Sequence, residues 1–354
     1  MSSILFYDPL CQRPYDTRNL ATTALGGTES TLTRIADALD AFVIQHNRTE
    51  DWGRYRSPQR IEGIERVIVI RDSRALPWVR ERYPHARSYL WLHDRLRPGS
   101  RRARWLAGTA AILRDMAVTA VCVSDWQRRG VEATLERIGV AGRVRAVTLY
   151  NPVDDALVPD ATPVDPNKLV FFSSPNKGLH FALDVFATLK RAIPALRLVV
   201  GNPGYKSAPG VRRDGVEFLG AQRQPRMHAE VRSALCTFHP NFLIPETFGL
   251  VFAESHALGT PVLTLDCGAA REIVGDAEEV LPMRDAYRLY EAAFGALAPS
   301  WRLLPARLAG AAGLFDAYVE RIRAWHEGAR PKAAPDVRFR LRSVTAGWRA
   351  LLAL

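Results

Sequence analysis

The chain has 354 residues, 47% of them hydrophobic and 24% charged, which is enough apolar material for two ordinary cores and excludes a wholly disordered protein. No stretch approaches the roughly 20 apolar residues that a membrane span needs. Residues 1–10 carry neither the basic leader nor the small-residue cleavage site of a signal peptide. We therefore expect a cytoplasmic protein of two domains.

The net charge of +11 comes mostly from arginine, because only five of the 48 basic residues are lysine. The densest basic patch consists of Arg95, Arg97, Arg101, Arg102 and Arg104. Such a patch can contact the phosphates of an acceptor or the anionic inner face of a membrane, and a solvated surface loop is the alternative. The sequence lacks a zinc-finger spacing and an aromatic RNA-binding signature, so we expect no nucleic-acid partner.

Short β-rich runs alternate with helix-length amphipathic runs in the first 150 residues. Strands are predicted at residues 4–7, 67–70, 89–92, 120–124 and 144–149, and helices at residues 29–41, 102–116 and 127–138. This alternation predicts a parallel sheet with helices on both faces. Four prolines and several acidic residues then interrupt the rhythm. We expect a first domain over residues 1–151 and a linker over residues 152–167.

The same rhythm resumes after the linker. Strands are predicted at residues 169–172, 196–200, 216–219, 235–239 and 262–265, and helices at residues 178–193, 227–233 and 249–258. A second α/β domain is therefore expected over residues 168–338. Residues 302–354 are helical in pattern apart from a break at residues 331–335, and we expect residues 339–354 to cross back onto the first domain.

Two glycines, Gly26 and Gly27, precede the first predicted helix. In open α/β sheets ligands bind beyond the carboxyl ends of the strands, where helix N-termini present free N–H groups. Paired glycines let a backbone approach a ligand closely, and a helix N-terminus favours a phosphate. An ordinary structural turn is the alternative. The motif is not the Gly-x-Gly-x-x-Gly of dinucleotide-binding proteins.

The most specific motif is residues 245–254, Pro-Glu-Thr-Phe-Gly-Leu-Val-Phe-Ala-Glu. Glu246 follows a predicted strand, and Glu254 lies about five residues into the next predicted helix, roughly 7 Å along its axis. Two carboxylates so placed can accept hydrogen bonds from two separate hydroxyl clusters, with backbone N–H groups between them. A nucleotide sugar has this layout of sugar, diphosphate and ribose. Two acids on a solvated helix face are the alternative, but the apolar neighbours of Glu254 favour a buried role.

These acids resemble the Glu-x7-Glu signature of retaining glycosyltransferases of the two-Rossmann GT-B fold, close to glycosyltransferase family four. The resemblance extends over nearly the whole chain through short motifs in the family's order: Gly26-Gly27-Thr28-Glu29, His93-Asp94, Val123-Ser124, Asn151-Pro152-Val153-Asp154, Asn176-Lys177-Gly178, Phe218-Leu219-Gly220 and Gly259-Thr260-Pro261-Val262. Most of these motifs are weak individually, but their order and spacing make the combination strong. It implies two Rossmann-like domains that face each other across a cleft.

The resemblance also implies a role for each matching residue. Glu246 would bind hydroxyls of the donor sugar and Glu254 the nucleotide ribose, while Lys177 would neutralise the diphosphate leaving group. Main-chain contacts to the sugar or phosphate would come from Phe248, Gly249 and Leu250. In the other domain, Gly26 and Gly27 would face the phosphate and acceptor, and His93 would lie near the reacting centre. A solvated lysine and a polar packing histidine are the alternatives for Lys177 and His93.

One stretch departs from the family pattern. The family usually has a Gly-Arg pair about six residues before the lysine, whereas residues 170–174 here read Val-Phe-Phe-Ser-Ser. A bacterial subgroup with a shortened Ser-Ser-Pro-x-Lys-Gly turn is similar. We expect Ser173, Ser174 and Asn176 to replace some of the arginine's contacts with the donor. The departure leaves the identity of the donor open.

The mechanism implied by the resemblance is metal-independent sugar transfer with retention of anomeric configuration. The nucleotide-diphosphate sugar is then a co-substrate and no cofactor is expected. The acceptor would be a glycan, a lipid-linked molecule or a protein, in cell-envelope or surface polysaccharide synthesis. Two alternatives share the fold. One is a nucleotide-sugar epimerase or hydrolase, and the other is a catalytically inactive nucleotide-sugar-binding partner.

Overall fold

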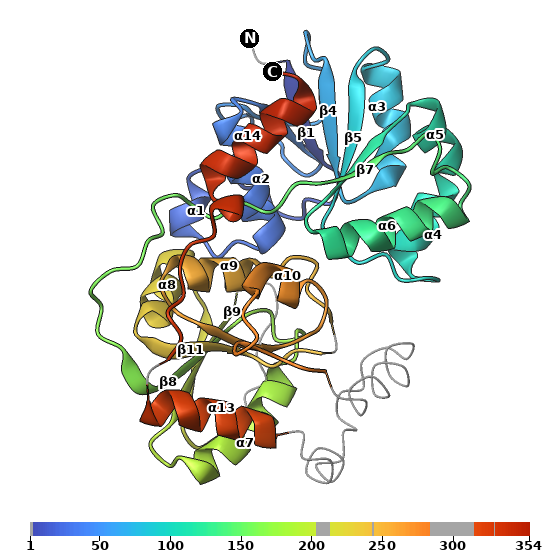
Figure 1. The fold of residues 1–354 in the computed structure, drawn as a ribbon. Helices are drawn as coiled ribbons and strands as arrows, with labels where there is room; N and C mark the ends of the chain where they lie inside the picture. The colour runs from blue at the N-terminus through green and yellow to red at the C-terminus, as the bar shows by residue number, and fades with distance from the viewer. Residues whose placement is uncertain (1–2, 203–212, 243, 284–314, 329) are drawn as a thin grey trace. The chain divides into compact units, whose positions relative to one another are not determined.

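The computed structural model describes residues 3–202, 213–242, 244–283, 315–328 and 330–354. The chain divides into two compact units (Figure 1). The first unit contains Met1–Asn19, Gly27–Asp154 and Val337–Leu354, and the second contains Leu20–Gly26 and Asp155–Asp336. Each unit is built on one parallel sheet covered by helices, which confirms the expected fold class of two Rossmann-like domains.

The sheet of the first unit has the strand order β3-β2-β1-β4-β5-β6-β7, with every neighbouring pair parallel. Its strands are β1 (Ile4–Asp8), β2 (Phe42–Gln45), β3 (Tyr55–Arg56), β4 (Arg66–Ile70), β5 (Arg87–Leu92), β6 (Thr119–Cys122) and β7 (Ala146–Thr148). The strand order reverses between β1 and β4. In a doubly wound sheet this reversal marks the place where ligands bind.

Successive residues of a strand point to opposite faces, and β1 shows both faces of the first sheet. Leu5 and Tyr7 pack with the helices α3 (Leu76–Arg82), α5 (Ala110–Asp115) and α6 (Asp125–Arg137). Phe6 points the other way, towards Trp348 of the last helix, α14 (Leu341–Leu352), with ring centroids 5.8 Å apart. Figure 1 shows α14 beside α2 (Gly27–Ala38), which it contacts. The C-terminal helix thus returns to the first sheet, as expected.

The prediction of a single helix over residues 102–116 is wrong. The structure has two helices there, α4 (Arg101–Gly108) and α5, with a break at Thr109 (φ −108°, ψ 12°). Gly108 is a poor helix former. The Thr109 hydroxyl donates to the carbonyl of Trp105 at 3.0 Å and lies 2.8 Å from the Ser73 hydroxyl. Such side-chain bonds compete with continuation of the helix.

The sheet of the second unit has the order β10-β9-β8-β11-β12-β13, again all parallel. Its strands are β8 (Asp165–Phe172), β9 (Arg197–Asn202), β10 (Val216–Ala221), β11 (Ala234–His239), β12 (Val262–Leu265) and β13 (Val280–Leu281). β8 begins inside the range expected as linker. The order reverses between β8 and β11, so the loops that follow these two strands meet at one edge of the sheet.

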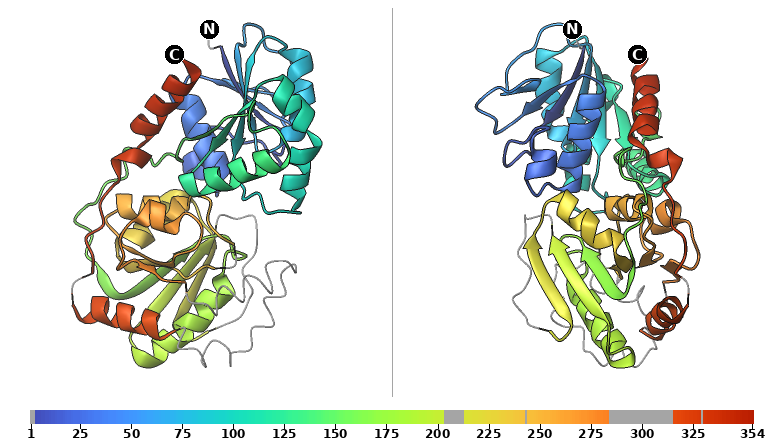
Figure 2. Two further views of the ribbon diagram at one scale, coloured as in Figure 1. Left: turned by 45° about the vertical axis from the view of Figure 1, so that its right-hand side comes forward. Right: turned by 90° about the vertical axis from the view of Figure 1, so that its left-hand side faces the viewer.

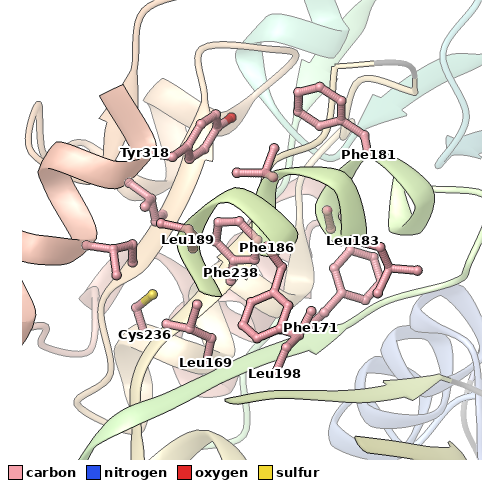
Figure 3. Packing of buried hydrophobic residues seen from close by; sticks show 14 of the residues in the cluster. Leu169, Phe171, Phe181, Leu183, Phe186, Leu189, Leu198, Cys236, Phe238 and Tyr318 are labelled. Atoms are coloured by element: carbon pink, nitrogen blue, oxygen red, sulfur yellow. The ribbon is translucent and has the colours of Figure 1, made fainter. Parts of the chain in front are cut away.

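Helices cover both faces of the second sheet. On one face, α7 (Leu179–Ala192) and α13 (Asp316–Glu327) lie side by side (Figure 2) and enclose the larger core. Figure 3 shows Phe171, Phe186 and Phe238 gathered around α7 in this core, with Tyr318 of α13 beside them. On the other face, Val170 packs with Met227 of α8 (Gln224–Arg232). Residues 302–314 of the expected helical tail lie outside the described residues.

Candidate functional site

The second unit brings Lys177 and Glu246 into direct contact at the reversal point of its sheet. Lys177 follows β8 and Glu246 follows β11, the two strands at which the order reverses. The Lys177 Nζ lies 2.8 Å from the Glu246 Oε2. The Glu246 side chain is buried, with 8% of its surface exposed, whereas the lysine side chain is one-third exposed. A carboxylate and an ammonium group therefore form a partly buried ion pair at the edge of the sheet where a ligand is expected.

A tight turn carries Lys177 from β8 into α7. The backbone N–H of Lys177 donates to the Ser174 carbonyl at 2.8 Å, and the Ser174 hydroxyl donates to the Asn176 Oδ1 at 2.6 Å. Gly178 caps α7 with a left-handed backbone (φ +89°), and a Cβ there would lie 3.2 Å from the Asn241 Oδ1. Glycine thus lets the turn approach the loop that carries Glu246. Ser173, which follows Phe172, lies at the start of the same turn.

The backbone of Glu246 is fixed by the loop after β12. Glu246 forms an isolated parallel bridge with Gly268, and the Ala269 N–H donates to the Glu246 carbonyl at 2.9 Å. Gly268 has a φ of +75°, and a Cβ at that position would lie 2.4 Å from the Glu246 carbonyl oxygen. Only glycine permits this close approach without displacing the backbone that carries Glu246.

Glu254 is buried on α9 (Leu250–Ala257), and its partners come from α8. The Gln224 Nε2 donates to the Glu254 Oε1 at 3.2 Å, and the His228 Nε2 lies 3.7 Å from the Glu254 Oε2. The sequence interpretation expected a buried role for Glu254 but did not identify these two residues. Their spacing of four, which places them on one helix face, was the available signal.

Phe248, Gly249 and Leu250 form the entry to α9. Phe248 is buried, and Gly249 caps the helix with a φ of +86°. The first turn of a helix has backbone N–H groups without intrahelical partners. The residues expected to offer main-chain donors therefore lie between the loop of Glu246 and the helix of Glu254.

His239, the last residue of β11, is a further site residue that the sequence interpretation missed. It is fully buried, stacks on Phe171 with ring centroids 5.5 Å apart, and meets the Phe252 ring edge-to-face at 5.2 Å. Its Nε2 lies 3.8 Å from the Glu246 Oε1. Burial lowers the pKa of His239 from 6.5 to about 4, with Glu246 acting in the opposite direction and Lys177 adding to the decrease. The imidazole is therefore neutral near pH 7.

The first unit places a second polar cluster at its own reversal point. Asp8 ends β1 and Arg71 follows β4, and the Arg71 Nη2 lies 3.9 Å from the Asp8 Oδ1 and 3.5 Å from the Glu29 Oε1. His93 follows β5, and its ring lies 4.6 Å from that of Trp91. Burial, and then the charge of Arg71, hold the pKa of His93 well below 6.5. The sequence interpretation selected His93 but missed Asp8 and Arg71.

The two glycines selected from the sequence lie at the start of α2, which begins at Gly27. Gly26 is grouped with the second unit and Gly27 with the first. Neither is among the glycines with a positive φ in the described part of the chain. Their backbone conformation therefore does not itself require glycine.

Two arginines of the patch at residues 95–104 lie over the indole of Trp105. Arg101 and Arg102 lie over the Trp105 ring at 4.9 and 4.8 Å from its centroid, and Arg74 joins them at 3.5 Å. Arg102 also pairs with Asp94 at 3.0 Å. Arg101 and Arg104 are exposed. In the described residues, no helix has both the length and the apolar character to cross a membrane. The same part of the chain has no cluster of three or more His, Cys, Asp or Glu side chains that could hold a metal ion.

Comparison with known proteins gives a family match over the second unit. A family model described as glycosyl transferases group 1 matches residues 166–298, a range that includes Lys177, Glu246 and Glu254. A phosphatidyl-myo-inositol mannosyltransferase of Mycobacterium leprae is 29% identical over 127 residues, which are 34% of this chain and 34% of the relative. The protein of the same name from Mycolicibacterium smegmatis is 28% identical over 191 residues, 50% of this chain and 47% of the relative. The chain thus spans no more than about half the length of these relatives.

A solved structure resembles the chain over its whole length. The crystal structure of Anabaena HepE in complex with UDP and glucose matches 99% of this chain and 99% of its own, with a TM-score of 0.64 at 17% identity. At this identity the likeness concerns the fold. The chain has the two-Rossmann GT-B fold, and its second unit carries the group 1 glycosyltransferase match.

Proposed function

We propose that this chain is a retaining, metal-independent glycosyltransferase that moves a sugar from a nucleotide-diphosphate donor to an acceptor hydroxyl. The observation that carries the proposal is the contact between Lys177 and Glu246 at 2.8 Å, with Glu254 buried on the helix that follows. The family match over residues 166–298 and the names of the mannosyltransferase relatives support sugar transfer.

The contact fits the chemistry of a nucleotide sugar. In such a donor the anomeric carbon is bonded directly to an oxygen of the diphosphate, so a carboxylate that binds the sugar and a cation that binds the phosphate must be adjacent. Glu246 would accept hydrogen bonds from sugar hydroxyls, and Lys177 would stabilise the charge that develops on the leaving diphosphate. Glu254 would accept the hydroxyls of the ribose, at the other end of the same molecule.

Backbone and small polar groups would complete the donor site. Phe248, Gly249 and Leu250 would direct main-chain N–H groups to the sugar or phosphate, and the turn of Ser173, Ser174 and Asn176 would contribute hydroxyl and amide donors. Gly26 and Gly27 would face the phosphate and acceptor, and His93 would lie near the reacting centre. A neutral His93 could donate or accept one hydrogen bond there.

In the proposed reaction the acceptor hydroxyl attacks the face of the sugar from which the diphosphate leaves. The bond between the anomeric carbon and the phosphate oxygen breaks, the new glycosidic bond forms on the same side, and the acceptor's proton passes to the departing diphosphate. Lys177 would take the part that a divalent ion plays in other transferases. This step gives the retained anomer.

The acceptor is proposed to be a glycan, lipid-linked molecule or protein in cell-envelope or surface glycan synthesis. Two observations favour a lipid-linked acceptor. One is the arginine patch of residues 95–104, and the other is that the names of the relatives specify phosphatidyl-myo-inositol as the molecule that is mannosylated. The exposed Arg101 and Arg104 could then contact an anionic membrane surface at the inner face of the membrane.

A thermal-shift panel tests the donor site. UDP-glucose, GDP-mannose, ADP-glucose and dTDP-glucose are added to the wild type, Lys177→Ala, Glu246→Ala and a control, His85→Ala, which changes an exposed residue of the first unit. We expect one class of donor to raise the Tm of the wild type and the control, and this shift to be lost in both site variants. An unchanged shift in the site variants would contradict the assigned site.

The products distinguish the proposed activity from its alternatives. The donor that binds is incubated with lipid-linked and glycan acceptors, with and without EDTA, and the products are analysed by NMR. Retained anomeric configuration, undiminished by EDTA, is the expected outcome. Free sugar or an epimer formed without acceptor would identify a hydrolase or epimerase, and binding without turnover would identify an inactive partner.

A further inference from the structure

His239 is a buried polar side chain in an apolar environment. Its ring lies between Phe171 and Phe252, and it has no exposed surface. Among the residues that the structure describes, neither ring nitrogen has a hydrogen-bond partner on another residue, and the ring's weak polar contact is with its own main chain. A buried donor or acceptor without a partner destabilises a fold, and a phenylalanine would satisfy the same ring contacts without this cost. The aromatic packing therefore does not itself require an imidazole at this position.

The imidazole lies close to an oxygen of the proposed sugar-binding acid. The two oxygens of Glu246 differ: Oε2 accepts the ammonium group of Lys177 at 2.8 Å, whereas Oε1 is buried and has no hydrogen-bond partner in the described part of the chain. The His239 Nε2 lies 3.8 Å from this Oε1. A shift of less than about 1 Å would bring the two atoms to hydrogen-bond distance.

The contact between Lys177 and Glu246 competes with the binding of the donor's diphosphate by Lys177. Lys177 cannot direct its full charge at a diphosphate while it is bonded to Glu246. When Lys177 turns to the phosphate, Glu246 loses the cation that the described residues place at its Oε2, and the buried carboxylate needs another donor to hold its orientation. The His239 imidazole can supply this donor, because its Nε2 lies 3.8 Å from Oε1. The residue ends a core strand, and its ring is held between two aromatic rings.

We propose that His239 is a positioning residue of the sugar subsite: its Nε2–H donates to the Glu246 Oε1 when Lys177 engages the donor's diphosphate, and so orients Oε2 towards the sugar hydroxyls. The inference rests on the proposed function, because it assumes that Glu246 binds the sugar. A histidine in this role acts on the sugar end of the donor alone. His228, which lies 3.7 Å from Glu254, marks the ribose end instead.

The test compares binding of a nucleotide sugar with binding of its own nucleoside diphosphate. The donor that shifts the wild-type Tm in the panel is used, and its affinity and that of the corresponding diphosphate are measured by calorimetry for wild type, His239→Phe, His239→Gln and His228→Phe. We expect His239→Phe to keep or raise the Tm of the free protein and to bind the diphosphate normally. Its affinity for the nucleotide sugar should fall by about tenfold or more.

The other variants serve as controls for this comparison of affinities. His239→Gln keeps an N–H donor and should recover part of the lost sugar affinity. His228→Phe should lower the affinity for the nucleotide sugar and for the diphosphate to the same extent, because both ligands carry the ribose. His85→Phe makes the same chemical change at an exposed position and should alter neither affinity.

Each outcome decides the question. If His239→Phe binds both ligands as the wild type does, or weakens both equally, His239 does not position the sugar-binding acid. If the wild type itself binds no donor, the proposed function fails first, and the inference fails with it. Should His239→Phe not fold, the ¹⁵N shift of the His239 Nε2 in the wild type is measured. It must change on addition of the nucleotide sugar, and an unchanged shift refutes the proposal.

Discussion

The buried His239 predicts how the stability of the second unit depends on pH. Burial lowers its pKa from 6.5 to about 4, so between these values the unfolded chain binds a proton that the folded chain does not. The contribution of this group is complete above pH 6.5 and is lost as the pH falls through the interval. At pH 4 the loss in the free energy of unfolding should be about 3 kcal/mol.

Native-state hydrogen exchange of the β11 amides measures this free energy in the second unit itself. Wild type and His239→Phe are compared between pH 4 and pH 7.5, and the difference between the two profiles isolates His239 from the other titrating groups. The wild type should lose stability relative to the variant below pH 6.5, while His85→Phe should follow the wild type throughout. Parallel profiles for wild type and His239→Phe would refute the assignment of a neutral, buried imidazole.

Three further substitutions test the site and the fold. Gly268→Ala places a Cβ 2.4 Å from the Glu246 carbonyl at a positive φ, so we expect it to cost about 2 kcal/mol or more and to abolish the donor-induced thermal shift; wild-type behaviour would mean that the loop adapts. Glu254→Gln should weaken nucleoside diphosphate binding by about tenfold in calorimetry, and an unchanged affinity would remove Glu254 from the ribose site. Trp348→Ala, which removes a fully buried ring of α14, should cost about 3–5 kcal/mol in urea unfolding of the first unit, and a loss below 1 kcal/mol would show that α14 does not stabilise that sheet.

The sequence predicts most of the longer elements of the fold, but it misses β2, α3 and the two shortest strands. Apolar strands such as β8 and β11 and the amphipathic α7 have a periodicity that identifies them locally. β3 and β13 have two residues each, and they exist because a neighbouring strand already presents a hydrogen-bonding edge. The break at Thr109 was also missed, because the hydroxyl contact with Ser73 joins residues 36 positions apart.

Site residues that lie in local motifs were predicted, and those that depend on contacts between distant elements were missed. Lys177 and Glu246 were selected through motifs at two strand ends, and the sheet order makes those ends adjacent although 69 positions separate them in the chain. Gln224 and His228 belong to no such motif. Their relevance depends on α8 lying against α9, a packing arrangement that periodicity alone cannot specify. His239 has the sequence pattern of an ordinary strand residue, because its significance lies in its contact with Glu246, which only the folded core creates.

Gly249 affects the positions of both Glu246 and Glu254, between which it lies in the sequence. Its left-handed backbone starts α9, and a Cβ at this position would lie 2.4 Å from the ring of Phe252. That ring in turn meets His239, whose Nε2 faces the unpaired oxygen of Glu246. A side chain at position 249 would therefore displace Phe252, loosen His239 and change the support of Glu246, while also altering the start of the helix that carries Glu254. The glycine between the two acids thus maintains the geometry at both ends of the proposed donor, which a requirement for backbone flexibility alone would not explain.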